Sequence, residues 1–350
     1  MNASPQSKQR VVVICPGRGT YNKEELGYLE RLHSDKVHLL DVIDANRRSN
    51  NQQTVSELDK MDKYSMRVHT AGENASCLIY ACALGDFTDI DTEKYDIVAV
   101  TGNSMGWYIA LAAAQVLAPK NAIQLINTMG SMMTNGSIGG QMIYPLMDNQ
   151  WQLSSSVQEN VLEHMKQVNA ISDCEVYDSI YLGGYLVIGG NEAGLAQLQN
   201  RLPAIDDTYP MRLFNHAAFH TPLLNSVSVK AQQMLVESMF QSPSIPLIDG
   251  QGKIWQPYSS NCRHLYNYTL GHQVTQTYDF SAAIAVAIKE FAPDKLIVLG
   301  PGTTLGGAVG QCLVASQWQQ INNKQAFINR QKSDPFVLAM GMTEQRKLMV

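Results

Sequence analysis

The sequence predicts an α/β protein in which a large domain with a parallel sheet is interrupted by a small α+β domain. Two observations predict this organisation. Compact apolar runs at Val11 to Cys15 and Asp96 to Thr101 end at Pro-Gly or Gly, as buried strands do, and helical patterns separate them. Between about residues 137 and 214 the elements follow the order β-α-β-β-α-β, which is typical of a split-βαβ, ferredoxin-like domain.

The predicted domain boundaries follow from these two patterns. Residues 1–136 and 215–317 form the large domain, 137–214 the small inserted domain, and 318–350 a polar C-terminal extension. At 350 residues the chain is long enough for two domains or for one domain with an insertion.

The first part of the large domain contains three predicted helices and one polar segment. Residues 44–66 are rich in Asn, Gln and Asp, which predicts a surface excursion. A helix is expected at about 67–85. After the second strand, Met105 to Leu117 predicts a helix rich in small residues, and Pro119 follows its end. A further helix is expected at about 120–133.

The remaining elements complete both domains. The small domain is expected to have strands at Gln141 to Met147, within Tyr177 to Ile188 and at Met211 to Phe214, with helices at about 157–168 and from Asn191. The rest of the large domain is expected to contain a helix from Pro222, a strand at 244–248, a helix at 281–291 and a strand at 295–299.

Composition and charge exclude several classes of function. A net charge of −5 without a dense Lys/Arg run argues against a broad nucleic-acid interface, which needs many phosphate contacts. The polar segment Met1 to Arg10 lacks the apolar stretch of a signal peptide, and no apolar run is long enough to span a bilayer. The six cysteines form no C-x-x-C pair, which predicts free thiols. We therefore expect a cytoplasmic protein.

A candidate nucleophile lies between the second strand and the helix that follows. Gly102-Asn103-Ser104-Met105-Gly106 has the pattern G-x-S-x-G, in which a sharp strand-to-helix turn exposes the serine hydroxyl. The N-terminus of the next helix offers amide donors for an oxyanion. The pattern alone is weak, but its place between strand and helix favours a catalytic serine over a chance turn.

A serine nucleophile needs a base, and two of the eight histidines are candidates. His220 lies in Ala218-Phe219-His220-Thr221-Pro222, immediately before a predicted helix. His216 lies four residues earlier. Local pattern alone does not separate the two.

Several blocks together resemble the malonyl-CoA:acyl-carrier-protein transacylase family of fatty-acid and polyketide synthesis, over about residues 10–317. The matching blocks, in the order of the family, are Pro16-Gly17-Arg18-Gly19-Thr20-Tyr21, the Ser104 turn, Phe219-His220-Thr221-Pro222, Gln273 with Phe280 seven residues later, and Gly300-Pro301-Gly302. The resemblance implies an α/β-hydrolase-like large domain with an inserted ferredoxin-like domain.

The resemblance also implies roles for individual residues. Ser104 would form an acyl-enzyme, and His220 would take its proton and later return it to the leaving thiol. The side-chain carbonyl of Gln273 would hold the imidazole, and the backbone N–H groups of Arg18 and Met105 would form the oxyanion hole. The donor would be an acyl-CoA and the acceptor an acyl carrier protein, with no metal or redox cofactor.

The departures from the family concern the choice of acyl group. The family's carboxylate-binding arginine falls at Met129, which cannot bind a carboxylate, and Trp107 stands where glutamate is common. Burying a malonyl carboxylate without its partner costs several kcal/mol. We therefore expect an uncharged acyl group, in a pocket lined partly by Met129 and Trp107. Alternatively another cation, Arg18 or Arg212, supplies the missing charge.

Two other functions are compatible with the resemblance. The chain could be a serine thioesterase or esterase, since the same elbow serves hydrolysis, but an α/β-hydrolase has its acid between serine and histidine, whereas Gln273 follows His220. It could also be a non-catalytic homologue that binds an acyl carrier protein. Retention of Ser104, His220 and Gln273 argues against that second alternative.

Overall fold

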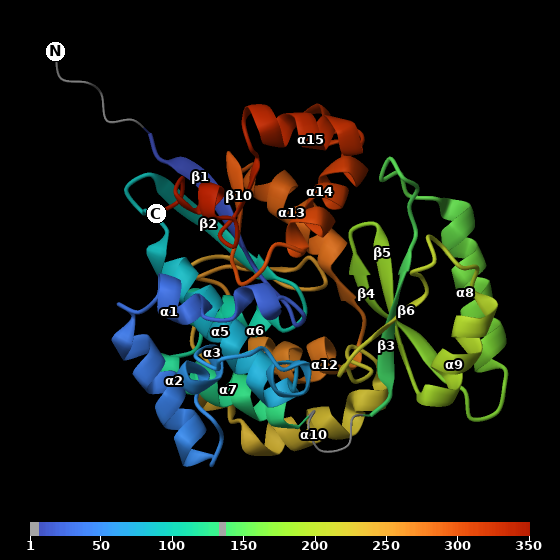
Figure 1. Ribbon diagram of the computed structural model, residues 1–350, viewed down its shortest axis with the longest axis horizontal. Coiled ribbons are helices and arrows are strands. Elements are labelled where there is room, and N and C mark those ends of the chain that lie inside the picture. The colour runs from blue at the N-terminus through green and yellow to red at the C-terminus, as the bar shows by residue number, and fades with distance from the viewer. Residues whose placement is uncertain (1–6, 133–137) are drawn as a thin grey trace.

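The computed structural model describes residues 7–132 and 138–350, which form two sheets with helices around them (Figure 1). The larger sheet has six strands in the order β11-β10-β1-β2-β7-β8. Its strands are β1 (Gln9–Cys15), β2 (Tyr95–Gly102), β7 (Leu247–Ile248), β8 (Ile254–Trp255), β10 (Lys295–Val298) and β11 (Val337–Ala339). All neighbours pair in parallel except β7 and β8, which confirms the predicted parallel sheet.

Apolar β-branched side chains explain the centre of this sheet. Val11, Val12, Val13 and Ile14 of β1 are fully buried, because β1 lies between two other strands and its sheet is covered by helices. Two helices matter most for the site: α6 (Gly106–Ala113) directly follows β2, and α7 (Pro119–Ser131) packs against α6 and α5 (Gly72–Asp89).

Eleven more helices of the described chain lie outside the segment of the second sheet. They are α1 (Tyr28–Leu32), α2 (Val37–Ser49), α3 (Val55–Asp59), α4 (Met66–His69), α10 (Asn225–Met234), α11 (Cys262–Asn267), α12 (Gln273–Thr275), α13 (Phe280–Phe291), α14 (Leu305–Ala315), α15 (Lys324–Ser333) and α16 (Thr343–Arg346). The single turns are η1 (Lys23–Glu25), η2 (Pro222–Leu224), η3 (Glu237–Met239) and η5 (Trp318–Gln320), and η4 (Tyr268–His272) is a π-helical turn.

The second sheet has five strands in the order β6-β3-β5-β4-β9. Its elements are β3 (Gly140–Pro145), α8 (Ser155–Asn169), β4 (Val176–Leu182), β5 (Tyr185–Gly190), α9 (Glu192–Arg201) and β6 (Met211–Leu213), joined by β9 (Tyr278–Asp279). The predicted β-α-β-β-α-β order is therefore confirmed. Helices α8 and α9 cover one face of this sheet (Figure 1). A separate apolar core lies between the two helices and the sheet.

Two segments differ from the sequence-based expectations. Residues 44–66, expected as a surface excursion, contain the end of α2 and all of α3, and Arg47 is fully buried. Its guanidinium donates to Gln53 O, Glu73 O and Asn74 Oδ1, so this buried cation is satisfied inside the protein. The predicted extension 318–350 contributes β11 to the edge of the large sheet.

The division into domains stays a prediction. The predicted boundary between residues 136 and 137 lies outside the described residues. The strand β9 comes from the segment assigned to the large domain, yet it pairs with β4 of the second sheet. The segment that follows the candidate base, His220, therefore contributes strands to both sheets.

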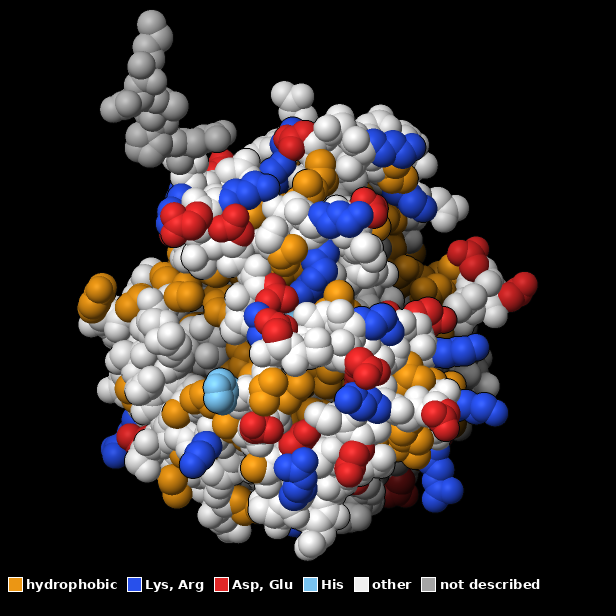
Figure 2. Space-filling model, turned by 60° about the vertical axis from the view of Figure 1, so that its left-hand side comes forward, with side chains coloured by type: hydrophobic (Ala, Val, Ile, Leu, Met, Phe, Trp, Pro, Cys, Tyr) orange, Lys and Arg blue, Asp and Glu red, His pale blue; other side chains and the backbone are white. Residues whose placement is uncertain are grey.

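The structure also bears on the predictions about membrane-spanning segments and cysteines. No helix among the described residues is long and apolar enough to cross a membrane. All six cysteines are free, and five of them are buried, as the absence of C-x-x-C pairs predicted. Figure 2 shows one face of the described chain, on which acidic and basic side chains are interspersed.

Candidate active site

Ser104 lies on a strained turn between β2 and α6. Its φ of +55° is in the left-handed region that non-glycine residues rarely adopt. The two flanking glycines permit the turn: a Cβ on Gly102 would lie 2.3 Å from the carbonyl carbon of Gly106, and one on Gly106 would lie 2.3 Å from Cys15 O. The predicted G-x-S-x-G turn is therefore built as a nucleophile elbow.

His220 is the histidine that contacts this serine. Its Nε2 lies 2.7 Å from Ser104 Oγ, and its Nδ1 lies 2.5 Å from the backbone carbonyl oxygen of Gln273. Because a carbonyl only accepts, Nδ1 carries the proton in the neutral ring, and Nε2 is free to accept the proton of Ser104. Burial lowers the pKa of His220 to about 4, against a smaller opposing effect of the Gln273 carbonyl. The ring is thus neutral at pH 7.

His216, the rival candidate, lines the same cavity but bonds elsewhere. Its Nδ1 lies 2.8 Å from Gln141 Oε1, and Gln141 in turn donates to Ser179 Oγ. Burial, together with the nearby Arg18, lowers the pKa of His216 to about 3. The structure therefore separates the two histidines that local sequence pattern left open.

The prediction that the side-chain carbonyl of Gln273 holds the imidazole is wrong. The backbone carbonyl of Gln273 holds the imidazole, whereas the side-chain Nε2 donates to Ser104 O at 3.1 Å and Oε1 accepts from the Tyr108 hydroxyl at 2.8 Å. The π-helical turn η4 ends immediately before Gln273, and such turns often re-aim backbone groups at functional sites. The side chain instead ties the elbow to α6.

Two backbone donors are available where the oxyanion hole was predicted. The N–H groups of Arg18 and Met105 donate to no described residue. Met105 is the N-cap of α6, so its amide lies at the positive end of that helix. The loop that carries Arg18 packs on the elbow, because a Cβ on Gly17 would lie 2.7 Å from Asn103 O.

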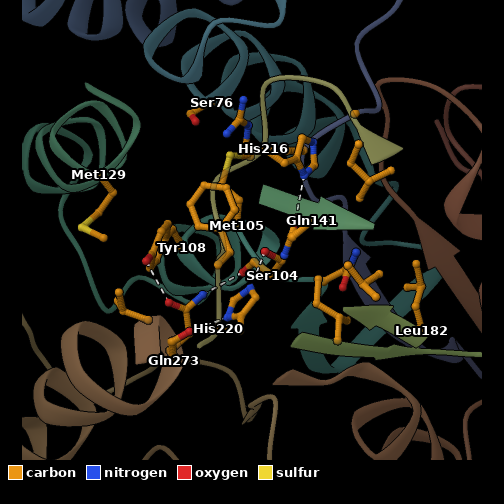
Figure 3. Close-up of a pocket in the computed structure, with 18 of the residues that line it drawn as sticks. Ser76, Ser104, Met105, Tyr108, Met129, Gln141, Leu182, His216, His220 and Gln273 are labelled. Carbon is orange, nitrogen blue, oxygen red and sulfur yellow. Dashed lines mark hydrogen bonds between the residues drawn. The ribbon is translucent and has the colours of Figure 1, made fainter. Parts of the chain in front are cut away.

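A cavity of about 350 Å³ opens beside Ser104, His220 and Gln273 (Figure 3). Met129 lines it, as predicted. Trp107 does not: it is fully buried, and its indole N–H donates to Thr269 Oγ1 at 3.0 Å. The prediction for Trp107 is therefore wrong, because α6 turns this side chain away from the cavity and against Tyr268.

The two cations considered as substitutes at Met129 lie in different places. Arg212 pairs with Glu192 at 2.6 Å and does not line the cavity. Arg18 lines it, and its Nη2 donates to Thr70 O and Asn215 O. Its guanidinium lies 5.6 Å from the centre of the Phe219 ring. Its Nε and Nη1 atoms are buried and have no partner among the described residues.

Sequence reasoning missed two tyrosines that support the site. Tyr108 bonds Gln273, and the Tyr278 hydroxyl donates to Gly102 O at 2.5 Å while its ring packs 5.3 Å from the His220 ring. Tyr278 lies between the Gln273 and Phe280 positions of the fourth block, which is the one signal in the sequence that points to it.

Comparison with known proteins decides the family resemblance. No protein-family model matches the chain. The polyketide biosynthesis malonyl CoA-acyl carrier protein transacylase PksC of Bacillus subtilis (strain 168) is 24% identical over 228 residues, which are 65% of this chain and 73% of that protein. The malonyl-CoA:acyl carrier protein transacylase FabD of Xanthomonas oryzae pv. oryzae superposes with a TM-score of 0.72 over 98% of each chain, at 14% identity.

The predicted resemblance to this family is confirmed. The chain has the fold of the malonyl-CoA:acyl carrier protein transacylases, an α/β-hydrolase-like domain with a small ferredoxin-like subdomain. A further similar structure is a malonyl-transacylase in complex with a type II polyketide synthase acyl-carrier protein (PlMCAT:AntF), with a TM-score of 0.67 at 17% identity over 87% of this chain and 93% of that one. Matches at these identities establish the fold, while the chemistry depends on the residues described above.

Proposed function

We propose that the protein is an acyltransferase that moves an acyl group from coenzyme A to an acyl carrier protein through an acyl-Ser104 intermediate. The observation that carries the proposal is the contact of 2.7 Å between Ser104 Oγ and the acceptor nitrogen of His220 at the edge of a cavity. The transacylase activity of PksC and FabD supports the reaction class, and the PlMCAT:AntF complex supports a carrier protein as partner.

The reaction divides into two half-reactions with opposite proton flow. Ser104 Oγ attacks the thioester carbonyl carbon while its proton passes to His220 Nε2. The oxyanion is stabilised by the Arg18 and Met105 amides, the C–S bond then breaks, and His220 protonates the coenzyme A thiolate. In the second half, the carrier thiol gives its proton to His220 and attacks the ester. The bond from carbon to Ser104 Oγ breaks, and His220 returns the proton to that oxygen.

We propose further that the transferred acyl group is uncharged. Met129, at the position of the family's arginine, offers a thioether in place of a guanidinium and is 7% exposed. Its neighbour along α7, Ile126, also lines the cavity and is 1% exposed. A carboxylate against this side would lose its hydration without gaining a cation, at a cost of several kcal/mol.

The pH dependence of acylation should report the low pKa of His220. The base is active as neutral imidazole, and burial lowers its pKa from 6.5 to about 4. We expect kcat/KM for the first half-reaction to stay nearly constant from about pH 8 down to about pH 5.5 and to fall only as the pH approaches 4. Stopped-flow release of free coenzyme A measures this rate. An apparent pKa near 6.5 in the free enzyme would contradict the buried, neutral imidazole.

The experiment that tests the function is intact-protein mass spectrometry after incubation with a panel of acyl-CoA donors. We expect a mass increase of one acyl group, mapped to Ser104 by peptide fragmentation, and loss of that adduct on adding a phosphopantetheinylated carrier protein. Transfer to the carrier much faster than to water supports the acyltransferase. Release to water at the same rate with and without carrier would identify a thioesterase, and absence of any adduct would identify a non-catalytic homologue.

A further inference from the structure

The sheet formed by β3, β4, β5 and β6 is apolar on both faces. On one face, Met142, Tyr144, Leu186 and Ile188 pack in the core beneath α8 and α9. The alternate residues point the other way, as the period of a strand requires. Seven of them line the cavity beside Ser104, and two of these are Gln141 and Met211. The other five form what we call the sheet wall: Ile143, Ile180, Leu182, Val187 and Leu213.

The open space of the cavity borders the sheet wall rather than the helices. On the opposite side, the helix wall consists of Tyr108, Ile126 and Met129, which are 6%, 1% and 7% exposed and are therefore almost sealed. On the sheet wall, Ile180 and Val187 are also buried, at 6% and 2% exposed. The other three, Ile143, Leu182 and Leu213, are only half-buried and are therefore less covered than the helix wall. Figure 3 shows Met129 and Leu182 on opposite sides of Ser104.

We propose that the acyl chain on Ser104 lies along the sheet wall, and that the preferred acyl group is an uncharged chain of several carbons rather than acetyl. The inference rests on the proposed function. A cavity of about 350 Å³ is within the usual size of small-molecule sites and has far more room than an acetyl group needs. Half-buried aliphatic side chains still expose apolar surface to water, and an apolar occupant would cover that surface. Each buried methylene of the occupant strengthens binding by about fourfold.

Charge supports the same occupant. No residue of the sheet wall is charged, and Arg18 is the one Lys, Arg, Asp or Glu among the described residues that line the cavity. Arg18 is held above Phe219 by the carbonyls of Thr70 and Asn215. A carboxylated donor whose transfer depends on Arg18 is therefore the competing occupant.

The test is a chain-length series of Ser104 acylation rates with acetyl-, butyryl-, hexanoyl-, octanoyl- and malonyl-CoA. We expect kcat/KM to rise by about fourfold per methylene from acetyl to hexanoyl in the unaltered protein. Ile143→Phe, which fills the space at the sheet wall, should lower the ratio of hexanoyl to acetyl rates at least tenfold. Val229→Phe on the exposed surface of α10 should leave that ratio within about twofold.

Leu213→Phe is the second blocking variant if Ile143→Phe fails to fold. Three results would overturn the inference. An equal fall in kcat/KM with every donor in the blocking variants would place the pantetheine arm of coenzyme A on the sheet wall. A preference for malonyl-CoA that disappears in Arg18→Met would make the acyl group an anion. A Ser104 acylation rate that does not depend on chain length would also contradict this inference, but not the proposed function. Absence of an adduct with every donor would instead refute the proposed function.

Discussion

Replacing Ser104 by alanine should abolish the acyl adduct, and replacing His220 by alanine should slow its formation by about 10²- to 10⁴-fold. The serine effect is complete because no other side chain of the elbow carries a hydroxyl group. The histidine effect follows from the loss of general-base catalysis, which contributes about 10²–10⁴ to a rate. His220 is the base to remove because its acceptor nitrogen lies 2.7 Å from Ser104 Oγ. Rapid-quench mass spectrometry of the first turnover measures both effects.

The matched control is His216→Ala. This histidine lines the same cavity and is likewise neutral at pH 7, because its pKa is lowered to about 3, but it is half-buried and bonds Gln141 instead of Ser104. We expect its loss to change the acylation rate by no more than about tenfold, since it removes one neutral hydrogen bond of about 1 kcal/mol. Equal damage from both histidine variants would mean that the Ser104–His220 contact does not carry the reaction.

The candidate site was predictable where local sequence determines geometry. A strand ending at Gly102 and a helix beginning at Gly106 force the serine outward, so Ser104 could be located from the pattern together with its place between strand and helix. The role of Gln273 could not be worked out in this way, because a π-helical turn decides whether its backbone or its side chain faces His220. Trp107 was misplaced for a similar reason, since a family alignment does not say which side of α6 faces the cavity.

The fold was predictable where apolar runs decide it. The strands β1 and β2 and the β-α-β-β-α-β order of the small sheet follow from buried β-branched residues and their period. The polar segments were not predictable, because their stability comes from partners far away in the sequence. Arg47 is satisfied by Gln53, Glu73 and Asn74, and nothing in the composition of residues 44–66 reveals those bonds.

The C-terminal segment shows the same principle in a buried ionic cluster around Asp86. Its carboxylate is fully buried and accepts from the Tyr28 hydroxyl at 2.8 Å and from the Gly300 amide at 2.7 Å. Arg346, 260 residues further along the chain, pairs with both Asp86 and Asp89. The cluster therefore connects the end of the chain to α5 and to the Gly300-Pro301-Gly302 turn, which is the last of the matching blocks.

His33 belongs to this cluster as well, and the group it forms is not a plausible metal site. Ligand atoms of His33, Asp86 and Asp89 lie within 4.8 Å of one another. Their negative charge is already balanced by Arg346, and Lys36 lies 2.6 Å from Asp89. A divalent cation would have to displace these side chains, so we interpret the group as an ion-pair network.

Arg346→Met should lower the free energy of unfolding by about 3–5 kcal/mol. Removing one partner of a buried ion pair leaves the other charge desolvated, and Arg346 is only 8% exposed. The matched control is Lys347→Met, which breaks the exposed pair of Lys347 with Glu344 at 2.8 Å and should cost no more than about 0.5 kcal/mol. Urea unfolding followed by tryptophan fluorescence measures both variants. Similar midpoints for the two would show that the buried network contributes no more than a surface pair, and that β11 is held by apolar packing alone.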